Sequence, residues 1–241
     1  MKSKLLILFL SILPCMAFNG ASGELQKVLI IGDSIAGGYL PHLKELLKDN
    51  AVVTLPLKEN GETFNCEGTT KGVREIESWM GDTKWDVIHF NFGLHDIKHI
   101  DPETGKNSKN LNHPQQANPE QYRKNLEEIV GKLKTSGAFL IFATTTPYPD
   151  TLGKQMHSPG MPKVYNEIAL EIMRDNEVEV NDLYSFVLPR MEELQRPNNV
   201  HFTEPGSEAL AEQVAKVIGK HLEQGSALTD QPDEQPAGYL D

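Results

Sequence analysis

A serine follows the first apolar run of the chain at a position that suits nucleophilic chemistry. Residues 27–31 (KVLII) are apolar and rich in β-branched side chains, which is typical of a buried parallel strand. Gly32 permits a sharp turn after the strand, so Ser34 would lie at the amino end of the next helix. Open α/β sheets bind ligands at this edge, where unpaired backbone N–H groups can hold an anion. Ser34 is therefore a candidate nucleophile, with a plain helix N-cap as the alternative.

Three more polar patches lie where strands are expected to end or helices to begin. They are residues 65–70 (NCEGTT), 91–96 (NFGLHD) and 198–206 (NNVHFTEPG). The last patch contains His201, which precedes a helix start marked by Thr203, Pro205 and Gly206. A serine hydroxyl attacks poorly until a base accepts its proton. His201 is therefore the candidate base, and a surface histidine without a role is the alternative.

In this order, the four patches resemble those of the SGNH (GDSL-type) hydrolases, a family of esterases, over about residues 25–223. The resemblance implies a flavodoxin-like three-layer α/β/α sandwich with a five-stranded parallel sheet. It also implies that Ser34 is the nucleophile and His201 the base. The backbone N–H groups of Ser34 and Gly68 match two of the family's three oxyanion donors, although Gly68 also fits a simple turn. Each such donor can lower the barrier by about 3–4 kcal/mol.

The third oxyanion donor departs from the family pattern. The family usually places an asparagine in a Gly-x-Asn-Asp motif, whereas residues 93–96 of this chain read Gly-Leu-His-Asp. An imidazole N–H donates a hydrogen bond as an amide does, so His95 can take this role. Asn91 is a second candidate, and a purely structural histidine is the alternative for His95. The supporting residues that we expect around these loops are Asp33, Asn91, Gly93 and Asp96.

The residue that orients the base departs from the pattern as well. The family normally supplies an aspartate three residues before the histidine, but this chain has Asn198 there, followed by Asn199. An asparagine can hold an imidazole through its side-chain oxygen, yet it contributes no negative charge. We therefore expect a Ser34–His201 dyad assisted by Asn198 or by a backbone carbonyl.

Strand-like runs alternate with helical patterns along the chain, which predicts a parallel sheet covered on both faces. The strands are expected at residues 27–31, 51–55, 85–91, 138–144 and 177–181. The helices are expected at about residues 36–48, 70–80, 119–135, 162–175, 184–195 and 205–223. After the fourth strand, Thr145, Thr146, Pro147 and Tyr148 are candidates to line the crevice that holds the nucleophile.

Three segments fall outside this alternation. Residues 1–23 combine a basic start, a short apolar run and small residues at the end, which predicts a secretory signal cleaved before Glu24 and export to a periplasm or the exterior. Residues 97–117 form a long polar loop, which we expect to be a wall or lid of the site. Residues 224–241 have little to bury and are predicted to be a disordered tail. This leaves residues 24–223 as one hydrolase-like domain.

Charge and cysteine content exclude several classes of partner. The net charge is −11, and loss of the predicted signal, which holds two lysines and no acid, makes it −13. Nucleic acids and anionic membrane surfaces require positive charge, so neither is an expected partner.

Cys66 is the one cysteine after the signal, and we interpret it as a half-buried small hydrophobe rather than a nucleophile. The histidines show no metal-ligand spacing, so no metal or other cofactor is expected.

These observations predict an exported serine esterase that removes small acyl groups, with acetyl favoured, through an acyl-enzyme on Ser34. The polar loop at 97–117 favours a carbohydrate or another hydrophilic alcohol as the esterified partner. The alternative is a weakened or non-catalytic carbohydrate-binding protein of the same fold, because His95 and Asn198 depart from the family. A flavin- or nucleotide-binding protein is disfavoured, since the first loop lacks a glycine-rich phosphate pattern and Asp33 would repel a phosphate. The oligomeric state stays open.

Overall fold

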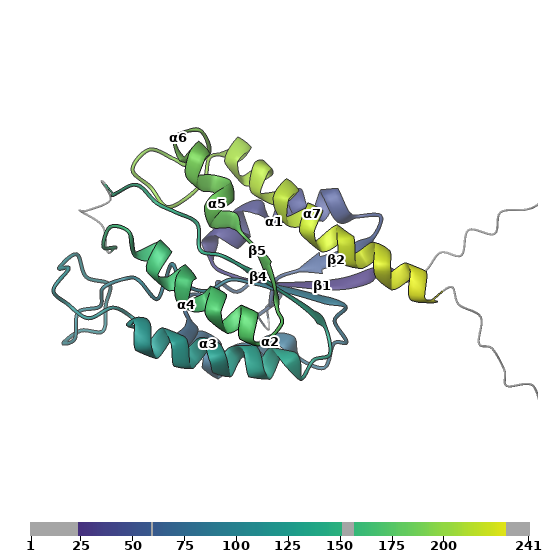
Figure 1. Ribbon diagram of the computed structural model, residues 1–241, viewed down its shortest axis with the longest axis horizontal. Coiled ribbons are helices and arrows are strands. Elements are labelled where there is room, and N and C mark those ends of the chain that lie inside the picture. Colours follow the sequence, from purple (N-terminus) through teal and green to yellow (C-terminus); the bar gives the residue numbers. More distant parts are fainter. Residues whose placement is uncertain (1–23, 59, 151–156, 230–241) are drawn as a thin grey trace, which may run out of the picture.

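The apolar runs form a parallel sheet whose strands are joined by helical crossovers. The computed structural model describes residues 24–58, 60–150 and 157–229 (Figure 1). The strands, in chain order, are β1 (Gln26–Ile31), β2 (Ala51–Thr54), β3 (Val87–Phe90), β4 (Phe139–Ala143) and β5 (Glu179–Asn181). They pair in the order β2-β1-β3-β4-β5, all parallel. This is the flavodoxin-like order, so the predicted fold class is confirmed.

The strand register brings the functional loops to one edge of the sheet. Ile31 at the end of β1 pairs with Phe90 at the end of β3, and Phe90 pairs with Phe142 of β4. The N–H of Asn91 then donates to the carbonyl of Ile31 at 2.9 Å. The strand order reverses between β1 and β3, and open sheets bind ligands at such a switch point. The segments that begin at Gly32 and Asn91 therefore start side by side.

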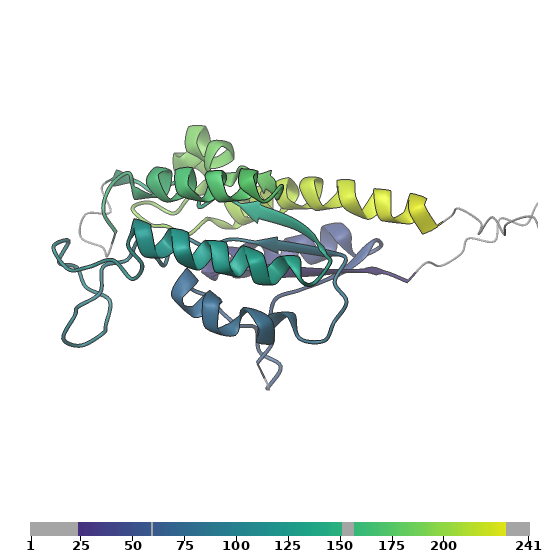
Figure 2. The same cartoon turned by 60° about the horizontal axis from the view of Figure 1, so that its bottom comes forward.

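Helices cover both faces of the sheet (Figures 1 and 2). The helices α1 (Ser34–Leu47) and α7 (Glu204–Thr229) pack together on one face. The other face carries α2 (Thr69–Met80), α3 (Pro119–Lys134) and α4 (Met161–Asp175). Alternate side chains of each strand enter the two cores, because successive residues point to opposite faces. In β1, for example, Val28 and Ile30 face α1, and Leu29 and Ile31 face α2.

The helix that we predict over residues 184–195 is wrong as a single element. The segment forms α5 (Leu183–Val187), a 3₁₀ turn (Leu188–Arg190) and α6 (Met191–Leu194). Pro189 has no N–H to donate, and its ring crowds the preceding helical turn, which disfavours a continuous α-helix through this point.

The last helix runs further than predicted. α7 continues to Thr229, six residues beyond the expected end and into the segment that we predict to be disordered. Of these six residues (QGSALT), glutamine, alanine and leucine are strong helix formers, whereas glycine, serine and threonine are weak ones. The predicted signal at residues 1–23 and the rest of the tail at 230–241 lie outside the described residues. Among the helices that the structure describes, none is long and apolar enough to cross a membrane.

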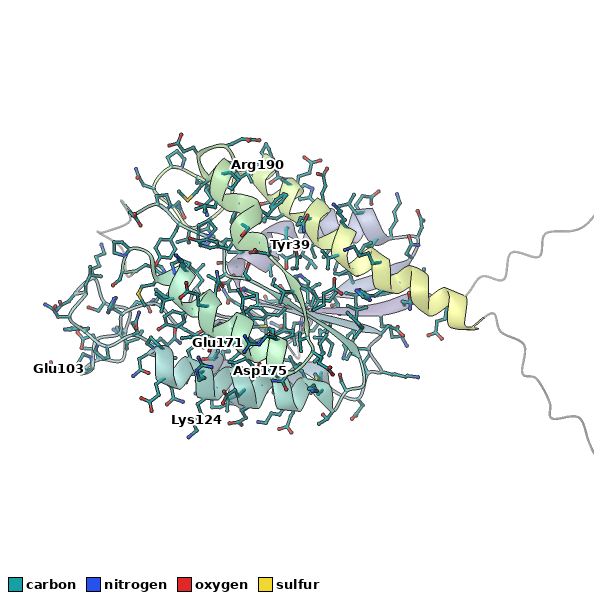
Figure 3. The ribbon with its side chains drawn as sticks, in the orientation of Figure 1. Tyr39, Glu103, Lys124, Glu171, Asp175 and Arg190 are labelled. Atoms are coloured by element: carbon teal, nitrogen blue, oxygen red, sulfur yellow. The ribbon has the colours of Figure 1, made fainter. Side chains whose placement is uncertain are left out.

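The long polar loop at residues 97–117 extends from the carboxyl edge of the sheet, with Glu103 at its outer end (Figure 3). Two isolated antiparallel bridges, His99 to Gln115 and Ile100 to Asn107, hold its two sides together. The loop is anchored where it joins the body, because Ile97 and Ala117 are fully buried.

Candidate active site

Ser34 is the first residue of α1, directly after the turn that ends β1. The side chain of Asp33 caps this helix, since its Oδ1 accepts the N–H of Ile35 at 2.9 Å. Gly32 is required in the turn because a Cβ there would lie 2.7 Å from the Cβ of Ala36. These contacts place the Ser34 hydroxyl at the carboxyl edge of the sheet, as predicted.

The structure brings Ser34 and His201 into contact, although 167 positions separate them in the sequence. The Ser34 Oγ lies 3.0 Å from Nε2 of His201. On the other side of the ring, Oδ1 of Asn199 accepts the backbone N–H of His201 at 3.0 Å and lies 2.8 Å from Nδ1. An atom that accepts a backbone N–H is the amide oxygen, so Nδ1 carries the ring hydrogen. Nε2 is left to accept the hydroxyl hydrogen of Ser34, which is the arrangement of a general base.

The supporting asparagine is Asn199, whereas the sequence pattern predicts Asn198. Asn198 has a positive φ of 53°, so the backbone turns in the left-handed region there and Asn199 comes under the imidazole ring. The correction moves the ring-orienting role by one residue and keeps its chemistry, an uncharged amide oxygen.

A short loop between α6 and α7 presents His201. The carbonyl of Leu194 accepts both the N–H and the hydroxyl of Thr203, at 2.9 and 3.0 Å. The N–H of Arg196 donates to the carbonyl of His201 at 2.9 Å, and a bridge joins Gln195 to Phe202. These bonds close the loop on itself and fix the direction of the imidazole.

Charges around His201 favour its neutral form. Partial burial lowers the pKa of this imidazole; the carboxylate of Asp33 opposes the shift, and the cations of Arg196 and Lys98 add to it. A neutral imidazole at neutral pH can accept a proton from Ser34. An ionised Asp33 favours a positive charge on this ring, although burial raises the pKa of Asp33, and the amide of Asn199 adds no charge.

Gly68 is held at the start of α2 by the loop after β3. Oδ1 of Asp96 accepts the N–H of Thr69 at 2.8 Å and its hydroxyl at 2.5 Å. Asn125 also donates to the Thr69 hydroxyl, at 3.1 Å. Burial raises the pKa of Asp96 to about 7 against the lowering effect of the two Thr69 bonds. A Cβ at Gly68 would lie 2.9 Å from Oδ1 of Asp96, so only glycine fits between the two loops.

Gly93 and Asn91 shape the loop after β3. Gly93 has φ 147°, and a Cβ there would collide with the Thr145 side chain, so a larger residue is excluded. Asn91 donates its side-chain N–H to the carbonyl of Ala143 at 2.8 Å. This bond braces the ends of β3 and β4.

His95 comes next to the nucleophile loop, where Nε2 lies 3.9 Å from Oδ2 of Asp33. Burial, together with the positive charge of Lys98, lowers the pKa of His95 to about 3, so the ring is neutral. Lys98 is a residue that the sequence analysis missed: its Nζ lies 3.1 Å from Nδ1 and 3.2 Å from Nε2 of His95. The i, i+3 spacing of the two residues in a tight turn was the signal available in the sequence.

The four residues after β4 have different surroundings. Thr145 and Thr146 line a narrow cavity together with Asp33, Tyr39 and Leu94. By contrast, Pro147 and Tyr148 are buried and act as braces, since the Pro147 carbonyl accepts from Gln195 and the Tyr148 hydroxyl donates to the carbonyl of Ser158. The lining of this cavity does not include Ser34, so the expectation that these residues line the crevice of the nucleophile stays a prediction.

Cys66 is fully buried rather than half-buried, and burial raises the pKa of its thiol to about 12. A protonated, inaccessible thiol is a poor nucleophile. Among the described residues, no group of three or more His, Cys, Asp or Glu side chains could hold a metal ion.

Comparison with known proteins supplies a family and several structural relatives. The sequence profile of the family described as "Protein of unknown function (DUF459)" matches residues 27–217. A lipase/acylhydrolase from Enterococcus faecalis superposes with a TM-score of 0.65 at 18% identity, over 81% of this chain and 96% of that one. An acetyl xylan esterase superposes with a TM-score of 0.62 at 18% identity, over 80% and 99% of the two chains. A protein from Slackia heliotrinireducens assigned to the SGNH hydrolases gives 0.58 at 17% identity, over 81% and 100%. Among curated proteins, no sequence matches this chain.

Proposed function

Since this chain belongs to the DUF459 family and has the fold of the SGNH hydrolases, we propose that it is a serine esterase. The observation that carries the proposal is the 3.0 Å contact between Ser34 Oγ and Nε2 of His201. The second nitrogen of the ring is held by Asn199 at 2.8 Å, which leaves Nε2 able to accept a proton. A hydroxyl paired with an oriented base at a helix start is the arrangement that activates a serine.

In the proposed reaction, the Ser34 oxygen attacks the ester carbonyl carbon while its hydrogen passes to Nε2 of His201. The negative oxygen of the tetrahedral intermediate is held by the N–H groups of Ser34 and Gly68 and by the imidazole of His95. The carbon–oxygen bond to the alcohol then breaks, and His201 returns its proton to the departing alcohol. Water repeats the sequence on the acyl-Ser34 ester and releases the acid, with His201 accepting and returning one proton.

The test of the proposed activity is a fluorophosphonate label followed by mass spectrometry of the tryptic peptides. We expect wild-type protein to be labelled on Ser34 and to hydrolyse p-nitrophenyl acetate. Ser34→Ala should abolish both signals while keeping the wild-type unfolding temperature. Ser185→Ala, at an exposed serine of α5, is the matched control and should behave as wild type. Full hydrolysis by Ser34→Ala would show that another group does the chemistry.

The substrate that we propose is a short acyl ester, with acetyl favoured, of a carbohydrate or another hydrophilic alcohol. The polar loop at 97–117 supports a hydrophilic alcohol. The fold shared with an acetyl xylan esterase adds to this. Acetate esters should therefore be hydrolysed faster than octanoate esters, and acetylated xylo-oligosaccharides should release acetate. A preference for octanoate would contradict the proposed acyl size.

A carbohydrate-binding protein without catalysis is the second candidate function. The observation that favours it is the neutral Asn199 where the base would gain from a carboxylate. This candidate predicts no fluorophosphonate labelling together with measurable calorimetric binding of xylo-oligosaccharides. Labelling of Ser34 would decide for the enzyme.

The proposed location of the protein is outside the cytoplasm. The basic and apolar residues 1–23 support export and cleavage before Glu24. Expression of the whole chain in a bacterial host, followed by fractionation and amino-terminal sequencing, tests this. A protein retained in the cytoplasm with its first residues intact would contradict export.

A further inference from the structure

A groove opens beside the loop that carries His201. Its volume is about 430 Å³, which is a usual size for a small-molecule site. One wall comes from the segment after β4, which includes Asp150, and the other from α6 and the loop that follows it. Gln195 joins the two walls, because its Nε2 donates to the carbonyl of Pro147 at 2.7 Å.

The loop that forms one wall of the groove also holds the proposed base. Asn198 lines the groove, and the next residue, Asn199, lies 2.8 Å from Nδ1 of His201. Consecutive Cα atoms are about 3.8 Å apart, so the groove begins one step along the chain from the residue that holds the ring. The left-handed backbone of Asn198, with φ 53°, turns the chain between these two surfaces. A molecule in the groove therefore contacts the same loop that presents His201.

The amide of Gln195 is incompletely paired at the groove. The residue is 3% exposed, and within the described residues its Oε1 has no hydrogen-bond partner. Burial of an unpaired amide oxygen costs free energy. Because Nε2 already donates to Pro147, what this amide lacks is a donor for its oxygen. A donor that the chain itself does not supply is therefore needed beside the groove.

The charged side chains of the groove suit a ligand that carries hydroxyl groups. Asp150 and Glu192, one on each wall, are exposed and form no ion pair within the described residues. Carboxylates accept hydrogen bonds from hydroxyl groups. Arg196 supplies donors, and its Nε is held at 2.9 Å by the carbonyl of Phe202, which fixes the guanidinium at the groove.

The other side chains and the overall charge narrow the class of ligand. Pro149, Met191 and Pro197 give the groove apolar surface, and a sugar ring combines apolar C–H faces with a hydroxyl edge. Two carboxylates face one guanidinium in the groove, and the net charge of the chain is −11, so an anionic ligand is repelled. A long acyl chain would remove water from the carboxylates without pairing them. A neutral sugar fits these conditions.

We propose that this groove binds a neutral sugar unit on the alcohol side of the ester that Ser34 cleaves. The inference rests on the proposed esterase function and deepens it, since it assigns a place to the carbohydrate that carries the acyl group. Asp150 and Glu192 accept from the sugar hydroxyls, and Arg196 donates to them. The groove lies outside the bond that breaks, so its contacts strengthen binding of substrate and transition state alike.

The first test compares two substrates that differ in the alcohol. Glu192→Ala should raise KM for acetylated xylotetraose about 5- to 20-fold with kcat within about twofold, because an acceptor for the sugar is lost. Hydrolysis of p-nitrophenyl acetate, which has no sugar, should be unchanged. Glu192→Gln keeps an acceptor and should recover most of the affinity. Glu193→Ala, at the next residue of α6, is exposed and outside the groove, so it is the matched control and should behave as wild type.

The second test measures binding without turnover. Calorimetric titration of wild-type protein with unacetylated xylotetraose, cellotetraose and chitotetraose should show saturable binding of at least one of them. Glu192→Ala should weaken that binding about fivefold or more, and Glu193→Ala should leave it unchanged. Unfolding temperatures of the variants should equal that of wild type, since both glutamates are exposed.

The outcomes distinguish this inference from the proposed function. Absence of Ser34 labelling would remove the esterase, yet the titrations would still test the groove. Failure of wild type to bind all three sugars would overturn the inference, whether or not Ser34 is labelled. It would also be overturned by an unchanged KM for acetylated xylotetraose in Glu192→Ala, or by equal losses on acetylated xylotetraose and p-nitrophenyl acetate.

Discussion

At the scale of single residues, the proposed base His201 is oriented by an amide that carries no charge. The Asn199 oxygen holds both the backbone N–H and Nδ1 of His201, so the geometry of the ring is complete without an aspartate. In the proposed mechanism, no negative charge contacts the imidazolium that forms when Ser34 attacks. Asp33 supplies part of this charge from further away, since it is the one group that raises the pKa of His201.

This leads to a prediction for Asn199→Asp. The carboxylate keeps the acceptor for Nδ1 and adds a negative charge, which stabilises the imidazolium and raises the pKa of His201. We expect kcat at pH 8 to rise about threefold to tenfold, while the acid limb of the kcat/KM profile moves to higher pH. Asn198→Asp is the control at the neighbouring position and should change kcat by less than twofold. A lower kcat in Asn199→Asp with an unchanged acid limb would contradict the role of Asn199.

The proposed nucleophile and base could be predicted from the sequence, and the residues proposed to assist them could not. Ser34 and His201 stand in patches whose position is dictated by strand ends and helix starts. The identity of the ring partner depends on the left-handed backbone at Asn198, which a spacing rule does not contain. Lys98 was missed because its meaning comes from the burial of His95 beside Asp33, a property of the folded chain alone.

At the scale of the elements, the start of α7 is packed against the end of α6, and this contact sets the position of the His201 loop. A Cβ at Gly206 would collide with the carbonyl oxygen of Leu194, the same oxygen that accepts both bonds from Thr203. Gly206→Ala should therefore separate the two elements, lower the free energy of unfolding by about 2 kcal/mol or more and reduce kcat.

Gly219→Ala is the matched control for this prediction, because it lies in the same helix with open space around it. It should raise the free energy of unfolding by about 0.5–1 kcal/mol and leave kcat unchanged. Chemical denaturation and steady-state kinetics on both variants provide the comparison. A Gly206→Ala protein as stable and active as wild type would show that the α6–α7 contact does not position the base.

A second element-scale link joins the start of α2 to the loop after β3 through Asp96. Asp96→Ala removes the acceptor of the Thr69 N–H and hydroxyl, leaving buried donors unpaired, so we expect a loss of about 2–4 kcal/mol in unfolding free energy. Release of Gly68 should also lower kcat more than it changes KM. Asp96→Asn keeps the Oδ1 acceptor and should lose less of both. Equal losses in the two variants would show that the acceptor is not what holds this link.

The sequence predicts the bounds of the strands better than those of the helices near the end of the chain. The five strands were predicted within about two residues of their ends, because apolar runs of this length can be buried only in a sheet covered on both faces. The segment 184–195 was predicted as one helix, since its apolar residues recur at helical spacing on both sides of Pro189, where the α-helix ends. The end of α7 was placed too early, because the composition of residues 224–229 favours neither burial nor a continued helix.

At the scale of the whole molecule, the sheet separates two apolar cores, and one of them contains a buried polar group. His89 in β3 is fully buried between Ile30 and Ile141 of the neighbouring strands. Its Nε2 lies 3.2 Å from Nδ2 of Asn181, whose Oδ1 accepts from Gln213 of α7. The amide donates to the ring, so His89 is neutral in the folded protein, and burial lowers its pKa to about 4.

The burial of His89 makes the stability of the whole molecule depend on pH. The pKa of His89 is about 4 in the folded chain, against about 6.5 when unfolded, so the unfolded chain binds the proton first as the pH falls. Stability from this residue is complete above about pH 6.5 and declines by roughly 3 kcal/mol toward pH 4. Denaturation at pH 7 and at pH 4.5 should show a smaller difference for His89→Gln than for wild type. The same change of unfolding free energy with pH in wild type and in His89→Gln would show that another group causes the pH dependence. The next histidines to replace would then be His95 and His157, whose pKa values burial lowers to about 3 and 4.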